Sequence, residues 1–203
     1  MHYEMVHAEN EVMKMPLPEP LPRRPIHRRV IDMNAYHRED GLYDIEARLV
    51  DTKPFDFPLI SSPAPLPAGE PLHDLWIRLT VDDAYVVRDI DARSDATPYP
   101  LCKEAESTLR VLVGQRIASG WSSIVKERLR GPAGCTHLME MLIPMATSAL
   151  QAIRGVKREG AKNVNPADVP VRLDSCYAYS RGREVIQRFW PQHYLPNEAK
   201  PQD

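Results

Sequence analysis

Two pairs of segments in this chain alternate between apolar and polar residues, and this pattern constrains the fold more than any other feature of the sequence. In the first pair, residues 31–35 and 43–49 flank an Asp40-Gly41 turn. In the second pair, residues 75–81 and 86–92 flank Asp82-Asp83. Successive side chains of a strand point to opposite faces, and Asp-Gly is a favoured hairpin turn. Each pair therefore predicts an antiparallel hairpin with one apolar face.

Three later segments carry apolar residues at helical spacing. They cover residues 102–113, residues 117–130, and a run that begins near Thr136 and contains Pro144, which is expected to kink or divide it. Near the end of the chain, residues 172–179 and 184–190 flank a turn and predict a terminal hairpin. The expected fold is α+β: an antiparallel sheet of two hairpins, packed by three helices on one face, plus a C-terminal hairpin.

Prolines mark the ends of the ordered region, since 20 of the 203 residues are proline and many are clustered. Residues 1–27 form a proline-rich arm with a basic cluster, and we expect this arm to be extended. Residues 28–196 then form a single α+β domain, and residues 197–203 form a tail. Within the domain, residues 51–71 are expected to make a long irregular crossing, because prolines interrupt any regular element there.

The overall composition excludes several classes of protein. The net charge of −2 gives no general attraction to nucleic acid, and no apolar run has the length of a membrane span. The N-terminus lacks the pattern of a secretory signal, so we expect a cytoplasmic location. Three cysteines cannot all pair within one chain, and in a reducing compartment they are better interpreted as thiols or metal ligands. The oligomeric state is left open.

The candidate chemistry centres on Gly134-Cys135-Thr136-His137, where a glycine turn meets a helical pattern. A helix N-terminus favours thiolate over thiol, which is the form that binds metals or attacks electrophiles. Other possible ligands, also at the ends of predicted elements, are Cys102, His73 and Asp74. If these ends converge, Cys102, Cys135 and His137 bind one zinc or iron ion, with His73 or Asp74 as a fourth or supporting group.

Two other functions stay open at this point, beside the simpler interpretation that the cysteines are buried apolar side chains. In the first, the protein is an enzyme acting on a small organic acid, with the metal as Lewis acid or with Cys135 as nucleophile and His137 as its base. Arg38, Arg78 or Arg93 then clamps the carboxylate of the substrate. In the second, the protein is a non-catalytic interaction module that docks through its proline-rich arm.

Several of these segments together resemble a known bacterial family. The residues that carry the resemblance are 37–46, 51–53, 69–76 and 134–138, and the family is the one catalogued as domain of unknown function 2889. The order of strands, cysteine loop and helices is also similar to the U-type iron-sulfur cluster scaffold proteins. That likeness implies a ligand set at Cys102, Cys135 and His137, with His73 in place of a scaffold cysteine. Fewer thiolates than in the scaffolds favour a single ion over a transferable cluster.

Overall fold

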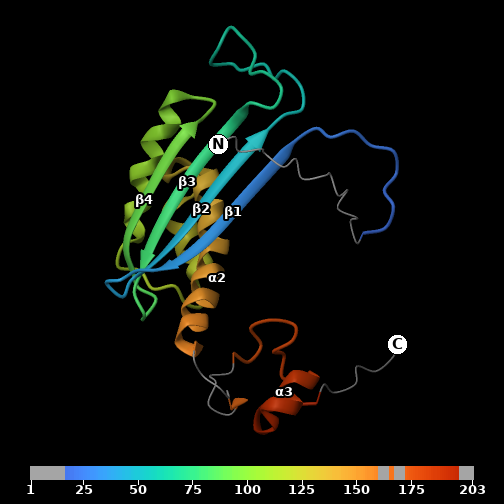
Figure 1. The fold of residues 1–203 in the computed structure, drawn as a ribbon, viewed down its shortest axis with the longest axis vertical. Helices are drawn as coiled ribbons and strands as arrows, with labels where there is room; N and C mark the ends of the chain where they lie inside the picture. The colour runs from blue at the N-terminus through green and yellow to red at the C-terminus, as the bar shows by residue number, and fades with distance from the viewer. Residues whose placement is uncertain (1–16, 160–164, 167–171, 197–203) are drawn as a thin grey trace, which may run out of the picture.

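A four-stranded antiparallel sheet forms the centre of the protein (Figure 1). The computed structural model describes residues 17–159, 165–166 and 172–196. The strands are β1 (Arg28–His37), β2 (Tyr43–Thr52), β3 (Pro71–Val81) and β4 (Val87–Ala96), and they lie in the order β1-β2-β3-β4. Both hairpins predicted from the alternating pattern are therefore confirmed.

The turn chemistry explains how the hairpins close. Gly41 adopts a φ of 84°, a left-handed conformation that side chains with a Cβ rarely adopt, at the end of the β1–β2 turn. In the β3–β4 turn, a carboxylate oxygen of Asp82 accepts hydrogen bonds from the backbone N–H groups of Ala84 and Val86. This Asx-type turn reverses the chain within a few residues.

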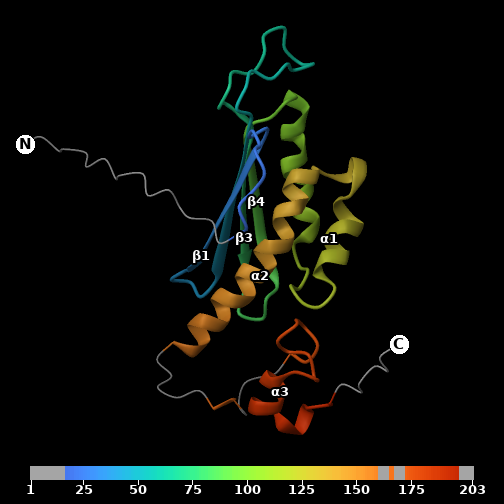
Figure 2. The same cartoon turned by 90° about the vertical axis from the view of Figure 1, so that its right-hand side faces the viewer.

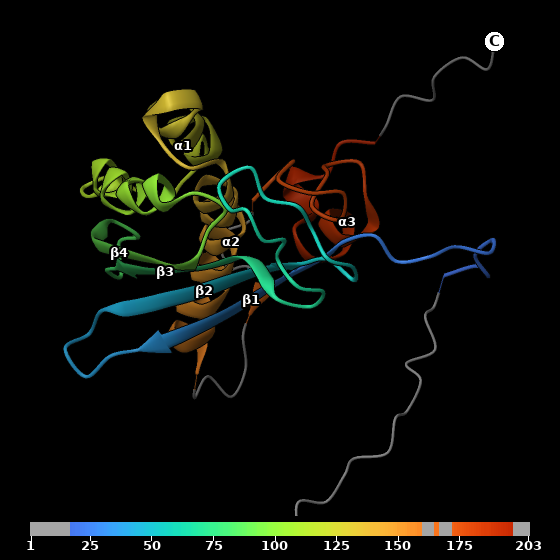
Figure 3. The same cartoon turned by 90° about the horizontal axis from the view of Figure 1, so that it is seen from above.

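Helical segments cover one face of the sheet (Figures 2 and 3). They are the 3-10 helix η1 (Pro100–Leu112), the helix α1 (Trp121–Leu129), the short 3-10 turn η2 (Gly131–Ala133) and the long helix α2 (Thr136–Arg158). Helix α2 packs on β1, β2 and β3, η1 packs on β4, and α1 packs on α2 and η1. The expected layer of three helical segments on one face is confirmed, and α2 continues through Pro144.

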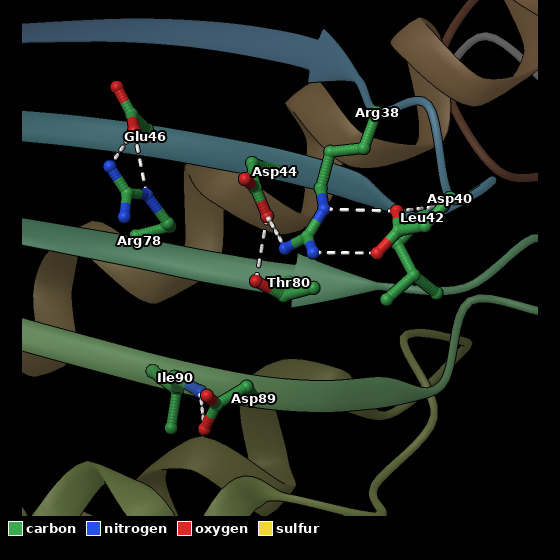
Figure 4. A network of polar contacts seen from close by, with 9 residues as sticks. All are labelled: Arg38, Asp40, Leu42, Asp44, Glu46, Arg78, Thr80, Asp89 and Ile90. Carbon is green, nitrogen blue, oxygen red and sulfur yellow. Dashed lines mark hydrogen bonds and ion pairs between the residues drawn. The ribbon is translucent and has the colours of Figure 1, made fainter.

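The core lies between this helical layer and the alternate residues of the strands. The buried residues of β2 are Tyr43, Ile45, Ala47, Leu49 and Asp51. In β3, every second residue from His73 to Val81 is buried on the same side. The opposite face carries charged and polar side chains, of which a part is shown in Figure 4. Period-two patterning thus assigns each strand residue to the core or to the open face.

The predicted C-terminal hairpin is wrong. Residues 184–189 form the helix α3 (Glu184–Phe189), the short 3-10 turn η4 (Pro191–His193) follows it, and residues 172–179 are turns. Ile186 and Trp190 are both buried and lie four residues apart, which is helical spacing rather than strand spacing. The apolar residues of this segment are therefore partners on one helix face.

Segments outside the sheet and helices agree with the sequence in part. Residues 53–70 are irregular except for a bridge between Phe57 and Leu66. Residues 17–27 are exposed and form no helix or strand, while residues 1–16 of the arm and the 197–203 tail lie outside the described residues. None of the helices in the described part of the chain has the length and apolarity that crossing a bilayer requires.

Candidate functional site

A buried carboxylate at the end of β2 is the centre of the candidate site. Asp51 is 2% exposed in its side chain, and Arg29 donates to both of its oxygens, with Nε–Oδ1 at 2.7 Å and Nη2–Oδ2 at 2.8 Å. His73 Nδ1 lies 3.0 Å from Oδ2, and His27 Nε2 lies 3.3 Å from Oδ1. An ionised carboxylate only accepts hydrogen bonds, so the Nδ1 of His73 carries the proton in this contact.

Strand register brings these residues together. Arg29 of β1 is opposite Asp51 of β2, and Asp51 is opposite His73 of β3. All three lie on the helix-facing side, because they continue the alternation that buries Leu49 and Leu75. Three side chains from three adjacent strands therefore form one row across the sheet, at the end where α2 begins.

Helix α2 adds an imidazole and a thiol to this row. His137 is the second residue of α2, and its ring lies over that of His73 with centroids 3.9 Å apart and planes 34° apart. Cys135 is the N-cap residue, and its Sγ lies 3.9 Å from His137 Nδ1. Glu140, one turn further along α2, accepts from Arg29 Nη1 at 2.9 Å. Arg29 thus links the helix to Asp51.

Gly134 allows the chain to place Cys135 at this position. A Cβ on Gly134 would lie 2.9 Å from the backbone oxygen of Leu129, the last residue of α1. That separation is shorter than a normal van der Waals contact, so any other residue would force α1 and the start of α2 apart. Gly134 is therefore required for the close packing of α1 against the start of α2, beside the site.

The electrostatics of the cluster favour a charged carboxylate and a neutral imidazole, and they make the thiol easier to ionise. Burial alone would raise the pKa of Asp51, but the hydrogen bonds and charge of Arg29 hold it below its ordinary value. Burial and the neighbouring His137 lower the pKa of His73. Burial opposes ionisation of Cys135, yet hydrogen bonds from His137 and from the backbone N–H groups of Leu138 and His137 lower its pKa.

Part of the expected ligand set is brought together in the structure. Within the described part of the chain, Asp51, His73 and His137 offer ligand atoms that all lie within 4.8 Å of one another. Cys135 is adjacent to the group through His137 but is not one of the three. Cys102 is half-buried in the first turn of η1, a segment that packs on β4, and it is not part of the group either. All three cysteines are free thiols.

Asp74 lies on the opposite face of the sheet from His73. Its two oxygens accept from Arg48 Nε and Nη2 at 2.9 and 2.7 Å. The Arg48 guanidinium also lies over the ring of Trp76, 4.6 Å from the centroid. Neighbouring residues of one strand point to opposite faces, so His73 and Asp74 do not contribute to the same site.

The arginines considered as carboxylate clamps lie away from this cluster, with Arg78 on β3, Arg93 on β4 and Arg38 just after β1. Arg38 binds Asp40 and Asp44, and Arg78 binds Glu46, as Figure 4 shows. Arg93 lies 3.7 Å from Glu106. Each of these guanidinium groups already faces a carboxylate of the protein, which any ligand carboxylate would have to replace.

Sequence reasoning missed Asp51, Arg29 and His27. Asp51 had a usable signal, because it stands at the next core-facing position after Tyr43, Ile45, Ala47 and Leu49. A charged residue at a core-facing position requires a partner. Arg29 lies two residues before Ile31 and so faces the same side of β1. The sequence alone does not give the strand register that sets Arg29 opposite Asp51.

The fold and the site define a class of protein: an α+β domain with a buried Asp-His cluster between a four-stranded sheet and the start of a long helix. The chain belongs to the family described as protein of unknown function (DUF2889), whose model matches residues 27–151. This range contains every residue of the cluster and ends within α2. A search of curated proteins and a search of solved structures each found no match, and the similarity to the U-type scaffolds receives no support from them.

Proposed function

We propose that the protein binds one divalent transition metal ion, zinc or iron, through Asp51, His73 and His137. The observation that carries this proposal is the convergence of three ligand-type side chains within 4.8 Å, two of them buried, from two strands and a helix. Two imidazoles and a carboxylate are a donor set suited to zinc or ferrous iron. The low pKa of His73 supports the proposal, since a metal ligand must be the neutral imidazole.

Metal binding requires two local changes. The lone pairs of an imidazole lie in the plane of its ring, so the tilted rings of His73 and His137, one over the other, must turn to face one ion. Arg29 must release one of its two hydrogen bonds to Asp51, because the carboxylate already has four contacts. Cys135 is then the nearest thiol available as a fourth ligand.

Zinc titration by calorimetry tests the proposal, using protein made without a histidine tag. We expect about one zinc ion per chain, and we expect His137→Gln to weaken binding by roughly 100-fold or more because it removes a ligand. His193→Gln is the matched control: His193 lies in η4, outside the strands and the helix that hold the cluster, so the zinc affinity of this variant should equal that of the wild type. Less than about a tenth of an equivalent bound would refute metal binding.

We propose thiol chemistry at Cys135 as the second candidate function. Its specific support is geometric: Sγ lies at the N-cap of α2 and 3.9 Å from His137 Nδ1, an arrangement in which an imidazole assists a thiol. The proposed substrate class is an electrophilic small organic acid, and the proposal does not include its binding by Arg38 or Arg78, which bind acidic residues away from this thiol. The three free cysteines fit the proposed cytoplasmic location.

Alkylation by iodoacetamide in a Cys102→Ser, Cys176→Ser background measures this reactivity at neutral pH. Cys135 should react roughly ten times faster than a cysteine in an unstructured peptide, because a larger fraction of it is thiolate. His137→Ala should remove most of that advantage. A saturating amount of zinc should protect the thiol if Cys135 is the fourth ligand. A rate equal to the peptide rate would exclude an activated thiol.

A further inference from the structure

Strand β1 is an open edge of the sheet. It pairs with β2 on one side, and among the described residues no backbone group pairs with its other side. The other edge is partly closed, because the backbone of Val87 in β4 is hydrogen-bonded to Gly114 and Gln115. Alternate N–H and C=O groups along the 10 residues of β1 therefore point away from the sheet.

This edge lacks several of the features that protect edge strands from pairing, although it carries the charged side chains Arg28, Arg29 and Asp32. β1 contains no proline, glycine or lysine, and its register with β2 is continuous over the whole strand. The β2–β3 and β3–β4 pairings are each interrupted by a register shift. Apolar side chains are exposed on both faces of β1, with Ile31 at 39% on the helix side and Tyr36 at 51% on the open side. Helix α2 contacts Arg29 through Glu140 and Met33 through Ser148, and it leaves Ile31 between them partly exposed.

We infer that β1 pairs with β1 of a second copy of this chain, antiparallel and centred on Met33. Such pairing joins two sheets into one of eight strands, and a two-fold axis normal to the sheet keeps both helical layers on one side. The interface is self-complementary, as a two-fold dimer requires. It goes beyond the proposed metal function and does not depend on it.

The side chains determine which register is favourable. With Met33 opposite Met33 of the second copy, Ile31 lies opposite Ala35 on the helix side, and Val30 lies opposite Tyr36 on the open side. Asp32 faces Asn34, a hydrogen-bonding pair already in contact within the chain at 3.4 Å. Cross-strand apolar pairs of this kind stabilise a sheet.

The neighbouring registers are less favourable. Centring the pairing on Asp32 sets two carboxylates opposite each other, and like charges in that position are destabilising. Centring it on Asn34 sets Ile31 opposite His37 and Val30 opposite Arg38. The Met33 register also sets Arg29 opposite His37 and Arg28 opposite Arg38 of the second copy, where Arg38 lies beyond β1 and is paired with Asp40 and Asp44. The interface therefore extends to Arg29, the residue that holds Asp51.

Sedimentation equilibrium of the full chain tests the inference. We expect a mass of about twice 23.1 kDa at micromolar concentration. Ile31→Lys places a charge in the interface and should give a monomer. Val111→Lys is the matched control, because Val111 of η1 is similarly exposed at 42% and lies outside the interface, so this variant should stay dimeric. A monomeric wild type, or an Ile31→Lys variant that stays dimeric, would overturn the inference.

Cross-linking tests the register. In a background with all three cysteines replaced by serine, Met33→Cys should form a disulfide-linked dimer on mild oxidation, because the two residues 33 face each other across the axis. Ile31→Cys is the comparison, since residue 31 faces residue 35 of the second copy and not its own equivalent. If Ile31→Cys cross-links as fast as Met33→Cys, the proposed pairing is incorrect.

Discussion

Replacing Asp51 with asparagine should abolish tight zinc binding and lower the free energy of unfolding by about 3 kcal/mol. Asparagine has nearly the same shape but no charge, so the Arg29 guanidinium loses the anion that it holds through two hydrogen bonds. His73 loses the acceptor that fixes its ring at 3.0 Å. Urea denaturation measures the stability, and calorimetry with zinc measures the binding.

The same substitution should change how stability depends on pH. The pKa of Asp51 is lower in the folded protein than in the unfolded chain, so the folded state favours the ionised carboxylate. Its contribution is therefore complete above the unfolded value of about 3.9 and disappears as pH falls through the lower folded value. The difference in unfolding free energy between wild type and Asp51→Asn should be largest above about pH 5 and should shrink in acid.

Asp74→Asn is the matched control for this prediction. Asp74 is also a buried aspartate on an adjacent strand and also binds an arginine through both oxygens, but it lies on the opposite face of the sheet. It should lose stability through the broken pair with Arg48 and keep the zinc affinity of the wild type. Equal loss of zinc binding in both variants would mean that binding depends on the stability of the sheet and not on the cluster.

Most of the sheet could be predicted because period-two alternation is a local property of the sequence. The same alternation also contained information about the site that the sequence analysis did not use. Extended by one step, it assigns Asp51 to the core and sets His73 and Asp74 on opposite faces. His73 and Asp74 are neighbours in the sequence and were therefore expected in one site, but they lie on opposite faces of β3.

The partners of His137 are set by long-range packing, which no local pattern encodes. The position of His137 over His73 depends on how α2 crosses β2 and β3, and on the tight approach that Gly134 permits. Cys102 was grouped with the site because it begins a helical segment, but η1 packs on β4 while α2 covers β1 to β3. The C-terminal error has a different cause, since a short apolar run fits either a strand or a helix.

Replacing Trp121 with alanine should lower the free energy of unfolding by about 3 to 5 kcal/mol. Trp121 begins α1, is 4% exposed, and donates a hydrogen bond from its ring nitrogen to the backbone oxygen of Leu142 at 2.9 Å. Its removal leaves a cavity where α1 packs on α2 and removes a second hydrogen-bond donor from the carbonyl of Leu142, which lies within α2. Domains of this size have a total stability of about 5 to 15 kcal/mol, so the loss is a large fraction of it.

Trp76→Ala separates this effect from the loss of any tryptophan. Trp76 lies on the open face of the sheet, is 38% exposed and is covered partly by Arg48, so its removal should cost about 1 kcal/mol or less. Because α2 carries His137 and Cys135 at its start, Trp121→Ala should also weaken zinc binding, whereas Trp76→Ala should not. Equal destabilisation by the two substitutions would contradict a core that lies on the helical side of the sheet alone.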